Sequence, residues 1–181
     1  MNKLKPIIWV ALLVFCCKTP EARKPISVKT GSFIDASVER NKKLNAQEQS
    51  HILKIIKQQP DKSFIASESG FWYYYNTKTD VDSLHTPHFG DIIDYNYDVK
   101  NLSGKTIYSK EDINAQRYVM DQQELFTGLR EGLKLMKTGE TVTFLFPSQK
   151  AYGYYGDQNK IGSNTPLICE VTVFSITENN N

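Results

Sequence analysis

The chain has 181 residues, a net charge of +2, 40% hydrophobic residues and 23% charged residues, which fits one globular domain with short extensions. Its 10 glycines and 7 prolines are too few for a collagen-like or low-complexity polymer, and the small basic excess argues against a nucleic-acid partner held by its phosphates. All 10 tyrosines lie between Tyr73 and Tyr155. We therefore expect this part of the chain to use aromatic rings with polar tips.

The N-terminus has the pattern of a secretory signal. Two lysines precede an apolar run over residues 7–15, which is shorter than the roughly 20 residues that a membrane-spanning helix needs. The run stops at Cys16 and Cys17, which resembles a bacterial lipoprotein signal, residues 1–16, ahead of an acylated cysteine. Cys17 is the better candidate because a small residue precedes it, whereas bulky Phe15 precedes Cys16. An ordinary cleaved secretory peptide is the alternative.

Cleavage before Cys17 would remove the two lysines of the signal and with them the whole net charge of +2. Cys169 would then be the only thiol besides the lipid-bearing one, so no intramolecular disulfide is expected and stability has to come from a packed core. Residues 17–43 mix charged residues with proline and glycine and show no sustained periodicity. They are interpreted as a lipid anchor and a mostly extended, flexible tether.

Residues 44–67 are predicted to form a short helical extension. Asn45 and Glu48 resemble the start of a capping box, and Pro60 prevents the helix from continuing. One apolar stripe follows the cap, formed by Ile52, Leu53, Ile55 and Ile56. A helix of about 14 residues is marginal alone, so we expect it to pack on the following domain; pairing with a second copy is the alternative.

Residues 68–178 are predicted to form an α+β domain. Apolar residues alternate with Asp94, Asn96 and Asp98, as in a half-buried antiparallel strand whose acidic side chains face solvent. Apolar residues at three- and four-residue spacings over 125–136 predict a helix, with Gly139 as its C-cap. Strands are predicted at 70–76, 93–99, 105–109, 117–120, 141–146 and 167–176. Strands on both sides of one short helix indicate an antiparallel sheet folded over that helix.

The usual catalytic constellations are missing from the sequence. His85 and His88 lie in a proline-bearing loop without a nearby cysteine, which does not favour a metal site. Cys169 lies on an apolar strand and is interpreted as a buried small hydrophobe rather than a nucleophile. No nucleophile elbow, Walker loop or dinucleotide fingerprint is found. We therefore expect no metal, no cofactor and no covalent chemistry.

Aromatic and aliphatic residues from several predicted elements remain, and each of them alone fits an ordinary core. They are Tyr97, Ile107, Tyr118, Leu125, Phe126, Leu129, Tyr152 and Ile161. Over roughly residues 70–177 the chain resembles the FKBP-type peptidyl-prolyl isomerases. The segments that carry the resemblance are residues 91–97, 104–109, 124–136 and 139–140, and above all 147–153 with its Ala-Tyr-Gly turn. Residues 21–26 and the overall layout further resemble the lipoprotein members associated with gliding motility.

The resemblance implies rotation of X-Pro bonds in proline-containing polypeptide clients. Rotation has to cross about 18–20 kcal/mol because amide resonance is lost at the twisted state. No bond breaks, so an apolar pocket that strips water from the amide and favours its twisted form is sufficient. In the family pattern, the Phe126 N–H donates to a substrate carbonyl and the Tyr152 hydroxyl donates to the carbonyl that precedes the proline ring. Leu129 forms the floor of the pocket.

Four departures from the family pattern weaken the expected activity. Leu129 stands where the floor is usually tryptophan, and Cys169 replaces a wall aromatic. Tyr108 replaces an acidic residue and Asp157 a loop histidine. Tyr108 and Cys169 are therefore the less certain pocket residues.

The sequence leaves two hypotheses for function. The first is a foldase that is anchored to the bilayer by a lipid on Cys17 and lies in the bacterial cell envelope, at the outer membrane and facing the periplasm. The alternative is a catalytically weak binding or structural lipoprotein.

Overall fold

The computed structural model describes residues 30–80 and 85–179, and side chains from residue 34 onward. The predicted signal, Cys16, Cys17 and the tether up to residue 29 lie outside the described residues. The chain divides into two units, Met1–Val38 and Glu39–Asn181, and the second contains everything discussed below except the start of one helix. No helix within the described residues combines the length and apolar character needed to cross a membrane.

Helix α2 (Thr30–Lys57) begins well before the predicted cap. The prediction of an extended tether is therefore wrong for residues 30–43, and Asn45 lies inside the helix. This stretch contains no proline and many residues of good helix propensity, so a continuous helix costs little free energy. A capping pattern also does not exclude its residues from a helix interior, where asparagine costs well under about 1 kcal/mol. The predicted end before Pro60 is confirmed, since α2 stops at Lys57.

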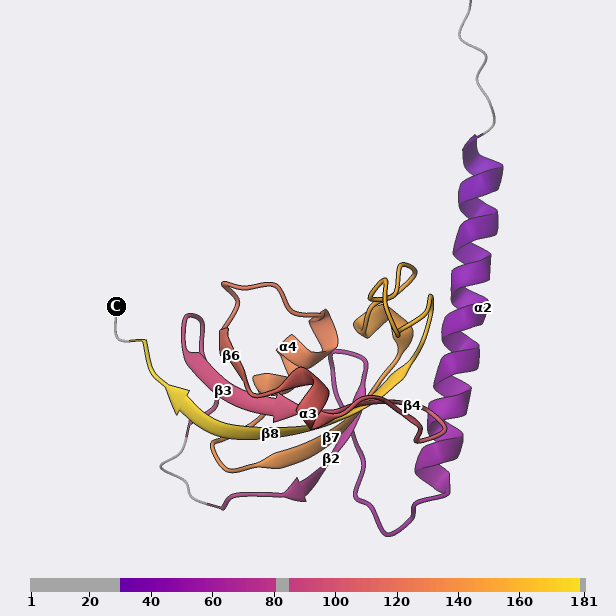
Figure 1. Ribbon diagram of the computed structural model, residues 1–181. Helices are drawn as coiled ribbons and strands as arrows, with labels where there is room; N and C mark the ends of the chain where they lie inside the picture. The colour runs from indigo at the N-terminus through magenta and orange to yellow at the C-terminus, as the bar shows by residue number, and fades with distance from the viewer. Residues whose placement is uncertain (1–29, 81–84, 180–181) are drawn as a thin grey trace, which may run out of the picture. The chain divides into compact units, whose positions relative to one another are not determined.

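The described residues of the second unit form an eight-stranded antiparallel sheet (Figure 1). Its strands are β1 (Ile65–Ala66), β2 (Trp72–Thr77), β3 (Ile92–Tyr97), β4 (Val99–Asn101), β5 (Thr106–Tyr108), β6 (Gln116–Val119), β7 (Thr141–Phe146) and β8 (Leu167–Thr177). The order is β1-β2-β7-β8-β3-β6, and β4 pairs with both β5 and β8. The predicted strands are confirmed. The two-residue strand β1, inside the range assigned to the helical extension, and helix α3 (Lys110–Ile113) are too short to leave a periodic signal.

The predicted alternation holds along β3 and breaks where the strand ends. Ile93, Tyr95 and Tyr97 are buried while the residues between them are half-buried. Asp98 is 8% exposed, so its prediction as a solvent-facing carboxylate is wrong. It lies between β3 and β4, where its N–H donates to the Glu170 carbonyl and its carboxylate accepts from the Glu170 N–H at 3.1 Å. This bonding compensates for the loss of hydration.

Helix α4 (Thr127–Leu133) packs closely on β7 because it presents two glycines to the sheet. A Cβ at Gly128 would lie 2.5 Å from Cδ1 of Phe146, and one at Gly132 would lie 2.9 Å from Cε1 of Phe144. The helix is confirmed but shorter than predicted, since residues 135 and 136 continue in three-residue turns. Gly139 is not its C-cap. It has φ +86° and bonds to the Val173 carbonyl at 2.9 Å.

Candidate active site

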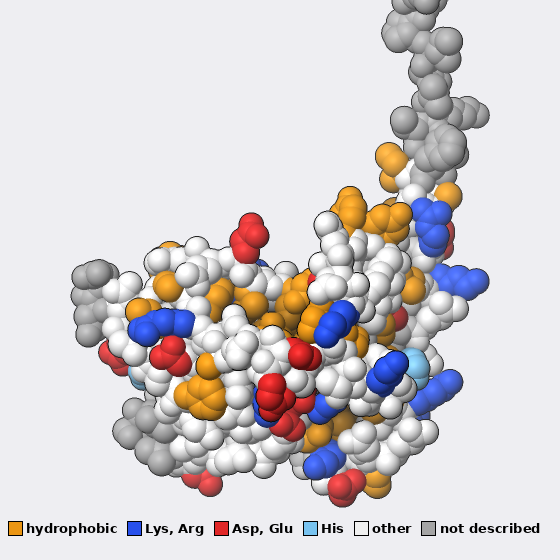
Figure 2. All heavy atoms as spheres, in the orientation of Figure 1, with side chains coloured by type: hydrophobic (Ala, Val, Ile, Leu, Met, Phe, Trp, Pro, Cys, Tyr) orange, Lys and Arg blue, Asp and Glu red, His pale blue; other side chains and the backbone are white. Residues whose placement is uncertain are grey.

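A hollow opens between the segment that enters α4 and the loop that follows the 3₁₀-helix η1 (Ser148–Lys150). Figure 2 shows hydrophobic side chains gathered in this hollow. The cavity holds about 580 Å³ and is lined by Gln123, Glu124, Leu125, Phe126, Arg130 and Tyr152. Three of these residues belong to the predicted pocket. The sequence does not predict Gln123 and Glu124, which precede α4, or Arg130, which lies on α4, as lining residues, because no apolar periodicity points to polar residues.

Phe126 is the central side chain of the hollow. Its ring centroid lies 5.1 Å from that of Tyr152 and 5.5 Å from that of Phe146, the latter edge-on. Phe126 is also the N-cap of α4, with extended backbone angles and no side-chain cap. Because the first N–H groups of an α-helix have no intrahelical acceptor, its backbone can serve a ligand while its ring forms the rim.

The fold brings all the predicted pocket residues into one apolar cluster. Its buried members are Tyr97, Tyr118, Leu129, Ile161 and Cys169, and the half-buried residues packed against it include Ile107, Tyr108, Leu125, Phe126 and Tyr152. The buried members lie beneath the hollow rather than on its surface. Cys169 is 0% exposed, which confirms its prediction as a core thiol, and burial raises its pKa. A role for each residue in binding stays a prediction.

Two tyrosine hydroxyls meet at the base of the site. Burial raises the pKa of Tyr97, and a side-chain hydrogen bond with Tyr152 raises it further. Burial also raises the pKa of Tyr152, while the bond with Tyr97 lowers it. Both phenols therefore stay protonated at neutral pH, and each hydroxyl can donate or accept a hydrogen bond.

A second pair joins two of the departures from the family pattern. The Tyr108 hydroxyl donates to a carboxylate oxygen of Asp157 at 2.5 Å. The other carboxylate oxygen accepts from the N–H groups of Asn159 and Ile161 at 2.9 and 2.7 Å. The bond to Asp157 raises the pKa of Tyr108. Burial raises the pKa of Asp157, but the bonds from Tyr108 and the backbone lower it more. Asp157 thus ties β5 to the loop that carries Ile161.

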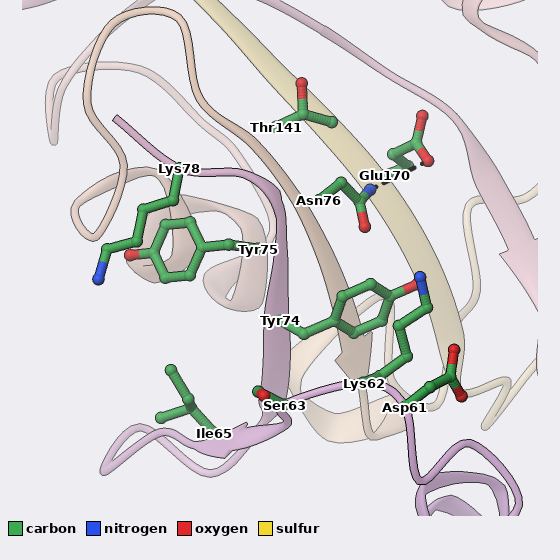
Figure 3. Close-up of a pocket in the computed structure, with 10 residues that line it drawn as sticks. All are labelled: Asp61, Lys62, Ser63, Ile65, Tyr74, Tyr75, Asn76, Lys78, Thr141 and Glu170. Atoms are coloured by element: carbon green, nitrogen blue, oxygen red, sulfur yellow. Dashed lines mark hydrogen bonds between the residues drawn. The ribbon is translucent and has the colours of Figure 1, made fainter. Parts of the chain in front are cut away.

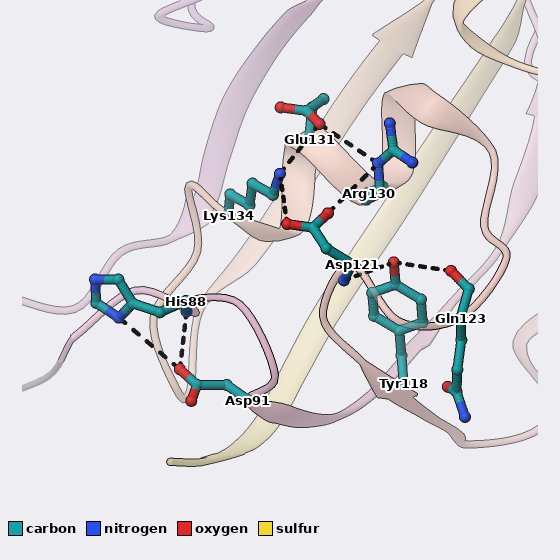
Figure 4. Close-up of polar contacts among 8 residues, drawn as sticks. All are labelled: His88, Asp91, Tyr118, Asp121, Gln123, Arg130, Glu131 and Lys134. Carbon is teal, nitrogen blue, oxygen red and sulfur yellow. Dashed lines mark hydrogen bonds and ion pairs between the residues drawn. The ribbon is translucent and has the colours of Figure 1, made fainter. Parts of the chain in front are cut away.

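The segment leading to Phe126 is held by a polar network (Figure 4). The Tyr118 hydroxyl donates to the Gln123 carbonyl and accepts from the Asp121 N–H, both at 3.3 Å. The Asp121 carboxylate lies 3.0 Å from the Lys134 ammonium and 3.7 Å from Nε of Arg130. Tyr118 therefore contributes a buried ring to the cluster and a hydroxyl that orders the approach to α4.

The two loop histidines lie beside a buried carboxylate, away from the hollow. Asp91 is 4% exposed and accepts from the N–H groups of His88 and Asn179 at 2.8 and 3.0 Å. His85 and His88 each place a ring nitrogen 3.9 Å from it. Among the residues that the structure describes, no group of three or more potential ligands is arranged to hold a metal.

Comparisons with known proteins agree with this geometry. Residues 85–174 match the model of the family described as FKBP-type peptidyl-prolyl cis-trans isomerase. The probable FKBP-type peptidyl-prolyl cis-trans isomerase FkpA of Neisseria meningitidis serogroup B is 30% identical over 86 residues, which are 48% of this chain and 31% of that protein. The chain thus contains an FKBP-type peptidyl-prolyl cis-trans isomerase domain, and its match spans less than a third of this relative.

Two solved structures share the fold. The peptidyl-prolyl cis-trans isomerase of Pseudomonas syringae pv. tomato has a TM-score of 0.59 at 19% identity, over 76% of this chain and 96% of that one. FkpA from Escherichia coli has a TM-score of 0.56 at 20% identity, over 96% of this chain and 82% of that one. The predicted α+β architecture, an antiparallel sheet with a short helix, is confirmed as FKBP-like.

Proposed function

We propose that the protein is a peptidyl-prolyl cis-trans isomerase that acts on X-Pro bonds of client polypeptides without a covalent intermediate. The observation that carries the proposal is the hollow itself: the rings of Phe126 and Tyr152 lie 5.1 Å apart over a buried apolar cluster that also holds Leu129. A cavity in which aromatic and aliphatic side chains lie beside a small number of polar ones suits a proline ring.

The catalysis we propose is the stabilisation of a twisted amide. The proline ring enters over Leu129 and the aromatic rim excludes water from its amide. The twisted amide has lost resonance and is less polar than the planar one, so the apolar surroundings favour it. The Phe126 N–H and the Tyr152 hydroxyl bind carbonyls of the flanking chain and hold it in a turn. Lowering the barrier by about 6 kcal/mol would accelerate rotation roughly 10⁴-fold.

The contact between Tyr108 and Asp157 favours an enzyme over a binding module. Taken one at a time, these residues remove an acid and a histidine from the family pattern. Taken together, they place the hydrogen-bond donor at position 108 and the acceptor at position 157, the reverse of an acid and a histidine at these positions. A link between β5 and the loop that carries Ile161 is therefore retained. Leu129 leaves a shallower floor and Cys169 a wider wall, which favours modest turnover and broad substrate tolerance.

The location we propose is the bacterial cell envelope, with Cys17 acylated and the domain facing the periplasm from the outer membrane. Support comes from the residue pattern of the N-terminus alone, where the apolar run stops at Cys16 and Cys17. The second candidate function is a catalytically weak prolyl-peptide-binding or structural lipoprotein of a gliding-motility machine. Leu129 and Cys169, where the family has large aromatic residues, favour it.

A proline-limited refolding assay with residues 18–181 tests the choice. If the protein is an enzyme, substoichiometric amounts accelerate the slow, proline-limited phase. Binding of the unfolded client without acceleration would support the structural alternative and overturn the proposed activity. A tetrapeptide isomerisation assay on the same sample separates loss of turnover from loss of client binding.

A further inference from the structure

Helix α2 contacts the active-site loop through a buried carboxylate. Glu48 is 6% exposed, and its two carboxylate oxygens accept from the backbone N–H of Ser148 at 2.8 Å and from the Ser148 hydroxyl at 2.7 Å. On either side of it along α2, Asn45 donates to the Gln149 side chain at 3.1 Å and Ile52 is 0% exposed. The contact lies within the compact unit Glu39–Asn181.

Glu48 acts as the cap that η1 lacks. The N-cap residue of η1 is Pro147, whose side chain makes no capping bond. Ser148 is 2% exposed, so its N–H and hydroxyl cannot form hydrogen bonds with water instead. A buried donor without an acceptor is costly, and a carboxylate is a strong acceptor. The start of η1 is therefore held from another element, one hundred residues away in the sequence.

Ser148 in turn holds the backbone on both sides of Tyr152. Its carbonyl accepts from the N–H groups of Ala151 at 3.0 Å and Gly153 at 2.9 Å, the two residues on either side of the tyrosine. Every polar group of Ser148 is thus engaged: two by Glu48 and one by the turn that carries Tyr152. A shift of Ser148 would move this turn, and with it the side chain of Tyr152, which lines the hollow.

We propose that Glu48 is a positioning residue for the isomerase site, and that α2 from Asn45 to Ile52 supports this site rather than merely linking it to the N-terminus. The inference rests on the proposed function, because it concerns how Tyr152 is aimed. The contact agrees with the expectation that the helix within residues 44–67 packs on the following domain, and the proposal assigns a role to a glutamate that the sequence offers only as a capping residue.

A double-mutant cycle between Glu48 and Tyr152 tests the proposal on residues 18–181, the same chain as in the refolding assay. Glu48→Ala is expected to lower kcat/KM in a tetrapeptide assay about tenfold, since small misplacements of an active group are expensive. In a Tyr152→Phe background it should have almost no further effect. Glu48→Gln keeps an acceptor for the Ser148 N–H and should restore most of the activity, which a change of charge alone would not explain.

Two controls separate positioning from general loss of stability. Gln47→Ala changes the exposed neighbour of Glu48 on the same helix and should leave kcat/KM unchanged. Val173→Ala removes methyl groups from the buried core at a residue of β8 that does not line the hollow; it lowers the melting temperature and should leave kcat/KM unchanged in folded protein. If Glu48→Ala does not fold, Ser148→Ala replaces it in the cycle, with an expected two- to threefold loss that again vanishes beside Tyr152→Phe.

The outcomes distinguish this inference from the function on which it rests. If Tyr152→Phe alone leaves kcat/KM unchanged, the proposed pocket is wrong. If Tyr152→Phe lowers kcat/KM while the Glu48 substitution either has no effect or adds its full effect to that of Tyr152→Phe, the pocket stands and the positioning role is overturned.

Discussion

The two faces of the sheet carry hollows that differ in kind. The registers of β2, β7 and β8 place Tyr73, Phe144 and Cys169 in one row, and the next row consists of Tyr74, Thr143 and Glu170. The first row faces the core beneath α4, whereas the second belongs to the outer face. The hollow on the outer face, whose lining includes Lys62, Tyr74, Asn76, Thr141 and Glu170, is the larger, at about 750 Å³ against about 580 Å³ for the inner hollow. Size therefore points away from the site that the family pattern identifies.

In the outer hollow, part of the polar lining is already paired, as Figure 3 shows for Asn76 and Glu170. Asn76 donates to Thr143 at 2.9 Å and to Glu170 at 3.2 Å, and Lys110 lies 2.8 Å from Glu170. The Lys62 ammonium already lies over the ring of Tyr74, 5.1 Å from its centroid. The inner hollow instead combines the rings of Phe126 and Tyr152 with the apolar cluster that they pack against. That combination, rather than volume, is typical of a binding site.

The largest expected effect comes from separating α4 from the inner face. In Gly128→Ala the new Cβ would lie 2.5 Å from Cδ1 of Phe146 and 2.7 Å from the Lys150 backbone carbonyl. Backbone cannot yield as a side-chain tip can, so we expect a loss of about 3 kcal/mol or more in the free energy of unfolding. Urea unfolding followed by circular dichroism measures it.

Gly162→Ala is the matched control for this prediction. Its Cβ would meet the Thr165 hydroxyl oxygen at 3.6 Å, an ordinary contact, and the change in stability should stay within about 0.5 kcal/mol. Equal losses in the two variants would show that close packing of α4 on β7 is not what restricts position 128.

The next largest effect is on activity. Tyr152→Phe removes the hydroxyl of the inner hollow, and we expect kcat/KM in a tetrapeptide isomerisation assay to fall about tenfold. The fall should be smaller than for the loss of an oxyanion donor, because no full charge develops during rotation. Tyr74→Phe makes the same chemical change on the outer face. A similar fall in both variants would contradict the assignment of activity to the inner face.

The sequence predicts the elements of the inner face well because each one has its own local signal. The apolar spacing of α4 and the stop at Pro147 after β7 can be read from neighbouring residues, and so can the alternation along β3. The family resemblance, carried above all by residues 124–136 and by the Ala-Tyr-Gly turn at residues 151–153, indicates the candidate pocket residues. Their common position in one cluster follows once these elements are placed in a single sheet.

The contacts that tune the site could not be predicted, because they join residues distant in the sequence. Glu48 meets Ser148 and Tyr108 meets Asp157 only in the folded chain. Periodicity also fails between elements: Asp98 follows the alternation of β3 but lies past its end, where the chain turns into β4. The start of α2 was missed because a capping pattern can also occur inside a helix.

A smaller effect should separate two neighbouring residues of β8. Cys169→Ser places a hydroxyl in the fully buried inner row and should cost about 1–3 kcal/mol in the free energy of unfolding. Glu170→Gln weakens a partly exposed ion pair with Lys110 and should cost less than about 1 kcal/mol. Urea unfolding of both variants checks the difference. Equal costs would mean that the two faces are not distinct in their packing.

The smallest expected effect is that of pH on catalysis. The pKa values of Tyr97 and Tyr152 are raised by burial, and that of Asp157 is lowered by its hydrogen bonds against the effect of burial. The two tyrosines contribute stability below their unfolded pKa near 10, and this contribution is lost above that pH. Asp157 contributes stability above about pH 3.9, and this contribution is lost as the pH falls through its lower folded pKa. We therefore expect kcat/KM to stay constant from about pH 5 to 9. An inflection in that range would assign the inner site a titrating group other than these three.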